Sequence, residues 1–335
     1  MRLIEKIKEQ SKSDPRAIVL AEGEEERTIR AAAISLDENI ATPVILGKPD
    51  RIKEIAQPLD IDLGDIKIVD PETSPDMDKY VSMYIGSREG KRVTEGMAQK
   101  LLKKPLYFGA TMVSSGDADG MVAGCMSLTA TVVKASELMI GLKEGISAPS
   151  SFFVMSVPDC PYGEGGNFIY ADAGVNPDPS PQELAEIAIL SAESAKELLG
   201  WEPRVAMLSF STKGSAGHKL LDKVIEALKI ARNLSPDLPI DGEFQLDAAI
   251  VPEVAERKIK EPSNVAGKAN VLIFPDLNAG NISYKLTQYL AKAEAYGPLL
   301  QGFAKPVNDL SRGARVEDIV GVMAFTNLQA QKSRK

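Results

Sequence analysis

The chain has 335 residues, of which 44% are hydrophobic and 26% are charged, and its formal net charge at pH 7 is −8. This length suits about two domains that each bury their own core, and the composition is that of a soluble globular protein. The negative charge argues against nucleic acid as a partner, because duplex binding needs a basic surface. No apolar run is long enough to cross a bilayer, so we expect no membrane contact.

The N-terminal segment, MRLIEKIKEQSKSDPRAIVLAE, has the pattern of a short amphipathic helix followed by a strand. It lacks the apolar stretch and the cleavage site of a signal peptide, so we expect a cytoplasmic protein. The two cysteines, Cys125 and Cys160, are too few for a disulfide framework or a four-cysteine zinc site. We expect both to be packed thiols.

Short apolar runs alternate with helical patterns along the chain. The expected strands lie at residues 17–21, 43–47, 121–124, 152–157, 205–209 and 270–275. The best-marked helices lie at residues 24–37, 181–199, 216–232, 281–293 and 316–330. Apolar runs without polar alternation are typical of strands covered on both faces, and regular alternation with helices is typical of parallel sheets. The sequence therefore predicts an α/β fold.

The most irregular region is residues 158–181, which is dense in glycine and proline. We expect a rim loop or a crossing between domains there, and we place the domain boundary shortly before it, near residue 148. The helix that follows has Ser180 as its expected cap and Pro181 in its first turn.

Two nucleotide-binding motifs are absent from the sequence. No GxGxxG follows a strand, and STKGSAGHKLL at residues 211–221 has the wrong spacing for a P-loop. His218 is the only histidine, which excludes metal sites that need two imidazoles. We expect His218 to lie partly exposed near a helix start.

Two strand-to-helix turns remain as candidate ligand sites. Their polar and glycine residues are Ser211, Thr212, Lys213, Gly214 and Ser215 in the first turn, and Asn278, Gly280 and Asn281 in the second. Backbone N–H groups of such turns, together with a helix N-terminus, suit a phosphate group. The alternative is a plain turn in which serine and glycine serve as caps.

Near the end of the chain, the stretch KPVNDLSRGARVEDIV gathers polar groups before an expected helix. Ser311 and Gly313 can form a turn there, and Asp318 can complement the helix dipole. That interpretation leaves Asn308, Asp309 and Arg312 unexplained.

Several long segments closely resemble phosphate acetyltransferases, also called phosphotransacetylases. They are SFSTKGSA, PIDGEFQLDAAIVP, KANVLIFPDLNAGN, YKLTQYLAKAEAYGPLLQG and KPVNDLSRG, in this order, with VLAEGEEERTIRAAA and VPDCPYG in the N-terminal half. The resemblance spans nearly the whole chain. It implies reversible conversion of acetyl-CoA and inorganic phosphate to acetyl phosphate and coenzyme A, without a metal or a cofactor, in acetate metabolism.

The resemblance also implies the fold and the assembly. It predicts two three-layer α/β domains with mainly parallel sheets that flank a cleft, as in isocitrate and isopropylmalate dehydrogenases, and usually a homodimer. The first domain would comprise residues 1–148 and 305–335, and the second residues 149–304. The active site would lie in the interdomain cleft.

The family's catalytic pattern falls on Ser311, Arg312 and Asp318, and its CoA-side arginine on Arg88. Asp318 would take the proton from the CoA thiol, whose sulfur attacks the acetyl phosphate carbonyl without a covalent enzyme intermediate. Ser311 would hydrogen-bond the developing oxyanion and Arg312 would hold the phosphate. An ordinary aspartate and an ordinary thiol differ by about 4.6 pKa units, or roughly 6 kcal/mol. Either proton transfer accompanies attack, or the closed cleft raises the aspartate pKa by desolvation while nearby cations favour the thiolate.

One position departs from the family pattern. Where the family typically reads HSTADTVRP, this chain reads SLTATVVKA, with Lys134 in place of the arginine. Lysine keeps the charge but cannot form the bidentate fork of a guanidinium. We therefore expect an altered phosphate affinity or acyl preference.

Three alternatives remain at this stage. The first is a phosphate acyltransferase for propionyl-CoA or butyryl-CoA, and the second is a non-catalytic acetyl-CoA-sensing module such as the domain of malic enzymes. The third is a metal-dependent decarboxylating dehydrogenase, which would need a metal-binding aspartate set and a nicotinamide site. The sequence shows neither pattern.

Overall fold

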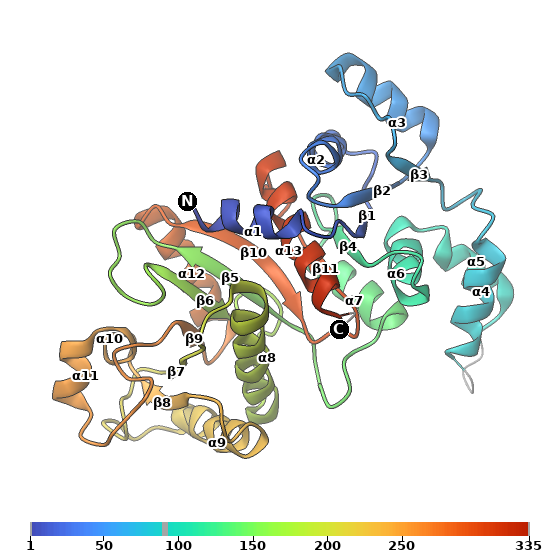
Figure 1. Cartoon of the computed structure of the whole chain (residues 1–335). Helices are drawn as coiled ribbons and strands as arrows, with labels where there is room; N and C mark the ends of the chain where they lie inside the picture. Colours follow the sequence, from blue (N-terminus) through green and yellow to red (C-terminus); the bar gives the residue numbers. More distant parts are fainter. Residues whose placement is uncertain (1, 89–92, 334–335) are drawn as a thin grey trace. The chain divides into compact units, whose positions relative to one another are not determined.

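The computed structural model describes residues 2–88 and 93–333 (Figure 1). They form two compact units: unit 1 comprises Met1–Lys143 and Phe303–Lys335, and unit 2 comprises Glu144–Gly302. In these described ranges, no helix combines the length and the apolar character needed to span a membrane. An active site in a cleft between the two domains stays a prediction.

Unit 1 is built on a five-stranded parallel sheet with the strand order β11-β4-β1-β2-β3. Its strands are β1 (Ala17–Leu20), β2 (Thr42–Leu46), β3 (Lys67–Val69), β4 (Gly120–Ala123) and β11 (Val307–Asp309). Its α-helices are α1 (Leu3–Ser11), α2 (Glu26–Asp37), α3 (Pro49–Ala56), α4 (Met77–Gly86), α5 (Glu95–Leu102), α6 (Pro105–Ser115), α7 (Thr129–Met139) and α13 (Val316–Ser333).

The C-terminal segment completes unit 1. Strand β11 pairs in parallel with β4, and α13 packs against α1 and α2 (Figure 1). The Asn327 side chain on α13 donates to the backbone carbonyls of Ser11 at 3.0 Å and Asp14 at 3.2 Å. These bonds satisfy the carbonyls at the end of α1, and so fix the two chain ends to each other.

The order of the strands creates a switch point in the sheet of unit 1. Strands β2 and β3 extend from one side of β1, whereas β4 and β11 extend from the other. Loops that leave neighbouring strands at such a point run in opposite directions, and open α/β sheets bind their ligands there, at the carboxyl ends of the strands.

Unit 2 is built on a six-stranded mixed sheet with the strand order β10-β5-β6-β9-β7-β8. Strand β5 pairs antiparallel with both β10 and β6, and the other pairs are parallel. The strands are β5 (Ser150–Ser156), β6 (Asn167–Ala171), β7 (Val205–Leu208), β8 (Ile240–Phe244), β9 (Val271–Ile273) and β10 (Glu294–Gln301). The helices are α8 (Pro181–Leu199), α9 (Lys219–Leu234), α10 (Leu246–Ile250), α11 (Pro252–Lys258) and α12 (Leu277–Leu290).

Helix α8 confirms its prediction from sequence, at both ends. The Ser180 hydroxyl accepts a hydrogen bond from the Glu183 backbone N–H, and the Glu183 carboxylate accepts one from the Ser180 N–H, which together form a capping box. Gly200 ends the helix in the left-handed conformation, with φ of 67°.

Two predictions in unit 2 are wrong in detail. Residues 158–181 are not irregular throughout, because strand β6 lies within them, between antiparallel β5 and parallel β9. Helix α12 begins at Leu277, earlier than the predicted residue 281. The Asp276 side chain caps it by accepting from the Ala279 N–H at 2.9 Å, so the expected ligand turn is the first part of this helix.

Gly280 lets α12 approach the segment after β6. A Cβ atom built at Gly280 would lie 2.1 Å from the carbonyl oxygen of Asp172. We predict that Gly280→Ala lowers the free energy of unfolding by about 1–3 kcal/mol, the usual cost of overpacking. Urea unfolding measures this change.

The matched control is Gly96→Ala on α5, an exposed helical glycine with open space around its Cβ position. It is expected to be stabilising by up to about 1 kcal/mol. An equal effect of both substitutions would contradict the close-approach role of Gly280.

Candidate functional site

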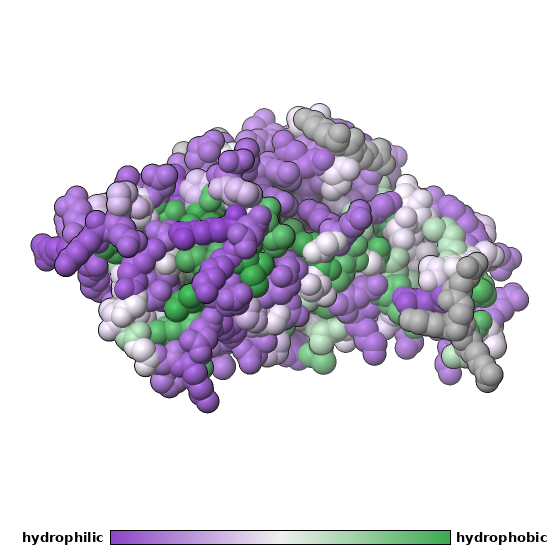
Figure 2. All heavy atoms as spheres, turned by 90° about the horizontal axis from the view of Figure 1, so that it is seen from below, coloured by the Kyte–Doolittle hydropathy of each residue, from purple (hydrophilic) through white to green (hydrophobic). Residues whose placement is uncertain are grey.

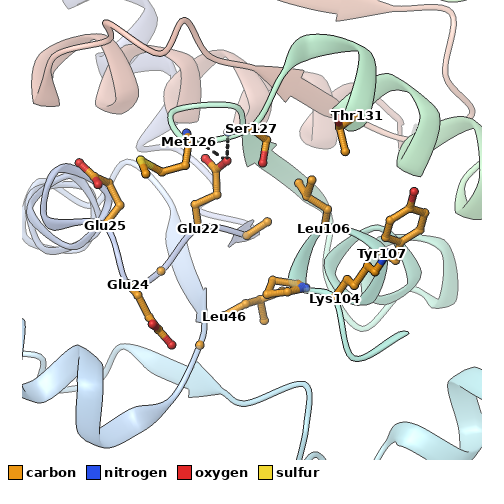
Figure 3. A pocket seen from close by; sticks show the side chains of 14 residues that line it. Glu22, Glu24, Glu25, Leu46, Lys104, Leu106, Tyr107, Met126, Ser127 and Thr131 are labelled. Atoms are coloured by element: carbon orange, nitrogen blue, oxygen red, sulfur yellow. Dashed lines mark hydrogen bonds between the residues drawn. The ribbon is translucent and has the colours of Figure 1, made fainter. Parts of the chain in front are cut away.

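Three loops gather at the carboxyl edge of the sheet in unit 1. We call them the β1 loop (residues 21–25), the β4 loop (residues 124–128) and the β11 turn (residues 310–315). A cavity of about 500 Å³ opens at this edge (Figure 3). Its lining comes from the β1 loop, the end of β2, the start of α6, the β4 loop and the first turn of α7. The cavity therefore lies at the switch point between β1 and β4.

Glu22 of the β1 loop organises the β4 loop. Its carboxylate accepts hydrogen bonds from the backbone N–H groups of Gly124 at 2.9 Å, Met126 at 3.1 Å and Ser127 at 2.7 Å. It also accepts from the Cys125 thiol at 2.8 Å. Figure 3 shows this carboxylate directed at the backbone of the β4 loop. Glu22 thus satisfies donors that the strand ladder leaves free, as a bound anion would.

The predicted catalytic residues Ser311 and Arg312 are both exposed on the β11 turn. The turn is closed by a hydrogen bond from the Ala314 N–H to the Ser311 carbonyl at 2.8 Å. The Ser311 hydroxyl accepts from the Gly313 N–H at 3.3 Å. A hydroxyl that accepts one bond still has its proton to donate, so this geometry is compatible with an oxyanion donor.

Asp318 lies in the first turn of α13, seven residues after Ser311. Its carboxylate accepts from the Arg315 backbone N–H at 2.9 Å and from the Arg315 guanidinium at 3.3 Å. The Arg315 and Asp318 side chains are 76% and 42% exposed, so this ion pair is weak and a substrate can compete for the carboxylate. The structure thus brings the three predicted catalytic residues into one turn and one helix start.

Arg88 contacts α7, and Lys134 is part of this helix. The Arg88 guanidinium donates to the carbonyl of Leu138 at 2.6 Å and lies 5.7 Å from the centre of the Tyr84 ring. Lys134 is exposed on the same helix, four residues before Leu138, so the two positions lie on adjacent turns of one face. Their roles in binding CoA and phosphate stay predictions.

The predicted phosphate turn in unit 2 satisfies several of its donors internally. The Ser211 hydroxyl and the Gly214 N–H both donate to the Glu243 carboxylate, at 2.8 and 2.7 Å. The Lys213 ammonium donates to Asp241 at 2.5 Å, and Thr212 Oγ1 accepts from a backbone N–H of the next loop. A phosphate would have to displace these carboxylates, and the assignment of this turn stays a prediction.

Ser215 and most of the α12 residues are also engaged in contacts within the protein. The Ser215 hydroxyl accepts from the Thr212 N–H at 3.0 Å, which closes the turn. Asn281 donates to the Ala173 carbonyl at 3.0 Å and Gly280 is a packing residue, whereas Asn278 is exposed. His218 lies at the start of α9, as the sequence predicts, and the structure shows that its Nδ1 caps the helix by accepting from the Leu220 N–H at 3.2 Å.

Asp309 is a buried group to which sequence reasoning assigned no role. It ends β11 and is 0% exposed, and its Oδ2 accepts from the Thr129 hydroxyl at 2.5 Å. Its Oδ1 has no hydrogen-bond partner among the described residues. Burial, helped by the charge of Glu22 and opposed by the Thr129 bond, raises the pKa of Asp309 to about 7. The polar run around Ser311 was the one available signal.

We predict that Asp309 makes folding pH-dependent. Because its pKa rises from 3.8 to about 7 on folding, its contribution to the free energy of unfolding falls as pH rises between these values. The side chain in Asp309→Asn stays neutral at every pH. The free energy of unfolding of this variant minus that of the parent should therefore be larger above pH 7 than below pH 4, by as much as about 4 kcal/mol. Urea unfolding across this window measures the difference, and a constant difference would contradict the assignment.

Across residues 2–88 and 93–333, no group of three or more histidine, cysteine, aspartate or glutamate side chains is arranged to hold a metal ion.

Comparisons with known proteins identify the family. The family model described as phosphate acetyl/butaryl transferase matches residues 2–327. The phosphate acetyltransferase of Thermoanaerobacterium thermosaccharolyticum is 53% identical over 332 residues, which cover 99% of this chain and 100% of that protein.

Solved structures agree with this family match. A phosphotransacetylase from Streptococcus pyogenes superimposes with a TM-score of 0.93 at 42% identity, covering 98% of both chains. A 4-hydroxythreonine-4-phosphate dehydrogenase from Klebsiella pneumoniae shares the fold, with a TM-score of 0.54 at 12% identity over 94% of this chain and 98% of that one. The resemblance seen in the sequence is confirmed, and the chain belongs to the phosphate acetyl/butaryl transferase family.

Proposed function

We propose that this protein is a phosphate acetyltransferase that interconverts acetyl-CoA and phosphate with acetyl phosphate and CoA. The observation that carries the proposal is the placement of Ser311, Arg312 and Asp318 on one turn and helix start of unit 1, in a chain 53% identical to a phosphate acetyltransferase over its full length. A carboxylate can act as a general base, a hydroxyl can donate to a developing oxyanion, and a guanidinium can neutralise a leaving phosphate.

The proposed reaction proceeds by direct transfer. The CoA thiol gives its proton to the Asp318 carboxylate while the sulfur forms a bond to the acetyl carbon. The bond between that carbon and the phosphate oxygen breaks, and phosphate leaves with the electron pair. Ser311 donates to the carbonyl oxygen as negative charge develops on it, and Arg312 neutralises the leaving phosphate.

Two side chains near the carboxyl edge of the sheet, Cys125 and Ser311, have nucleophilic atoms, but neither is activated for attack, and this supports direct transfer. Burial and the neighbouring Glu22 raise the pKa of the Cys125 thiol to about 12, so it carries little thiolate at neutral pH. The hydrogen-bond partner of the Ser311 hydroxyl is a backbone N–H, whereas an acyl-accepting serine needs a base beside it. Attack by the CoA sulfur itself needs neither residue.

We further propose that Arg88 binds CoA and that Lys134 binds phosphate or the acyl phosphate. Lys134 is a cation on α7, and the Arg88 guanidinium donates a hydrogen bond to the Leu138 carbonyl of the same helix. Helix α7 begins directly after the β4 loop. The cleft between the domains, the homodimer and the cytoplasmic location belong to this proposal as well.

Exposed apolar side chains on α12 support a homodimer. Ile282, Leu286, Tyr289 and Leu290 are 56%, 51%, 75% and 76% exposed, and their spacing places them on one helix face. Figure 2 shows hydrophobic side chains gathered in patches on a largely hydrophilic face of the molecule. Exposed apolar side chains that share one helix face are typical of contacts between proteins.

The experiment that tests the function is release of CoA thiol from acetyl-CoA, with and without phosphate, in the presence of a chelator. We predict release that depends on phosphate and resists chelation. Asp318→Asn should lower kcat by about 100-fold or more, the usual contribution of a general base, and Asp318→Glu should retain more activity. Absence of release from the parent would reject the function, and nearly unchanged turnover in both variants would reject the base.

A second candidate is a phosphate acyltransferase for longer chains. The matched family description includes both acetyl and butaryl transfer, which favours testing it. Rates on acetyl-CoA, propionyl-CoA and butyryl-CoA separate the two candidates, because the preferred substrate has the highest kcat/KM.

Lys134 provides a test of substrate binding. We predict that Lys134→Arg lowers the KM for phosphate or acyl phosphate several-fold and changes the KM for CoA less, because only a guanidinium forms a bidentate pair with an oxyanion. Lys100→Arg, on an exposed position of α5, is the matched control. Equal changes in both KM values would count against the assignment.

A further inference from the structure

Arg27, in the first turn of α2, joins the three loops at the carboxyl edge of unit 1. Its Nη1 donates to the backbone carbonyls of Arg312 at 2.9 Å and Ala314 at 2.8 Å. Its Nη2 donates to the carbonyl of Cys125 at 3.3 Å, and its Nε donates to the Glu25 carboxylate at 2.6 Å. One guanidinium therefore contacts the β1 loop, the β4 loop and the β11 turn.

The carbonyls that Arg27 binds lie on both sides of Gly313, in the turn that carries Ser311 and Arg312. A bond to a backbone carbonyl fixes the path of the chain and leaves the side chain of that residue free. Arg27 thus restrains the β11 turn from behind, while the Ser311 and Arg312 side chains stay exposed. The Arg27 side chain is itself only 28% exposed.

We infer that Arg27 is a positioning residue for acyl transfer, whose guanidinium holds the β11 turn against the β4 loop so that Ser311 and Arg312 meet the acyl phosphate in register. This inference rests on the proposed function. Arg27 acts through the backbone of the turn and does not touch the substrate.

Arginine is the residue that this arrangement needs. Its planar guanidinium presents five donors in a rigid fork, and Arg27 directs them at four acceptors on three loops. A lysine at this position keeps the charge but offers three donors on one atom, which cannot reach acceptors on both sides of the turn and on the β4 loop together. The ion pair with Glu25 fixes the fork in its plane.

The cost of losing the fork follows from the precision that catalysis requires. A displacement of about 1 Å in a positioning group can lower the rate by about 100-fold. Arg27→Lys and Arg27→Ala should therefore lower kcat by about 10- to 100-fold. The KM for CoA should change little, because Arg88, the proposed CoA-binding residue, is held by the Leu138 carbonyl of α7 and not by the turn.

The matched control is Arg30→Lys, one turn further along α2. Arg30 pairs with Glu26 on the same helix at 2.8 Å, and both side chains are largely exposed, at 39% and 53%. This substitution should leave kcat and KM unchanged. Any general effect of replacing a guanidinium by an ammonium at the start of α2 would appear in both lysine variants.

Two readouts distinguish positioning from a general structural role. Addition of guanidinium ion at low, non-denaturing concentration should restore part of the kcat of Arg27→Ala, because the free ion can occupy the same carbonyls. Hydrogen exchange of the Ala314 amide, which closes the β11 turn, should become faster in Arg27→Ala while the core strands stay protected.

The outcomes separate the inference from the proposed function. Lower kcat, constant KM for CoA and rescue by guanidinium ion would support the positioning role. Unchanged kcat with faster exchange at Ala314 would overturn it and leave the function intact, and so would lower kcat without rescue in a protein with faster exchange throughout. A parent protein without phosphate-dependent release would reject the function itself, whereas the exchange experiment would still show whether Arg27 holds the turn.

Discussion

The carboxyl edge of the sheet in unit 1 imposes one constraint on which the site depends. Where parallel strands end, their loops carry backbone donors and acceptors that the sheet no longer pairs, and these groups need partners. Two side chains from one short segment after β1 supply these partners, one as a hydrogen-bond acceptor and the other as a donor. Glu22 accepts from the N–H groups of the β4 loop, and Arg27 donates to the carbonyls of the β4 loop and the β11 turn. The side chains that we propose for catalysis therefore extend from loops whose backbone is held at several points.

The loops held by Glu22 and Arg27 are consistent with chemistry that needs no covalent enzyme intermediate. The substrate thiol brings its own nucleophile, so the protein needs only to remove a proton, to stabilise an oxyanion and to neutralise a leaving phosphate. In the proposed mechanism Asp318, Ser311 and Arg312 perform these three tasks. Ser311 and Arg312 lie on the β11 turn, and Asp318 lies in the first turn of α13. The buried Cys125 thiol, whose pKa is raised to about 12, instead serves as a hydrogen-bond donor to Glu22.

Local patterns in the sequence predicted what depends on local interactions. The Ser180 cap of α8 and several apolar strands of both sheets were predicted from local sequence. The roles of Ser311 and Asp318 come from the family resemblance and stay predictions. The contacts of Glu22 and Arg27 with the β4 loop and the β11 turn could not be predicted. In the sequence, EGEEERT has the pattern of a charged surface segment, and only the fold brings Glu22 and Arg27 to the other loops. The same limit applies to the turn at Ser211–Ser215. A glycine turn that binds phosphate and one satisfied by a carboxylate from another strand, here Glu243, have the same local sequence.

In the proposed mechanism the acetyl group passes directly between phosphate and CoA, with no acetyl group held on the protein. The most direct test is incubation of the protein with acetyl phosphate and isotopically labelled inorganic phosphate, in the absence of CoA. Direct transfer predicts no label in acetyl phosphate above the background without protein, and incorporation only when CoA is added. Incorporation without CoA would require an acetyl group held on the protein, and would contradict the account.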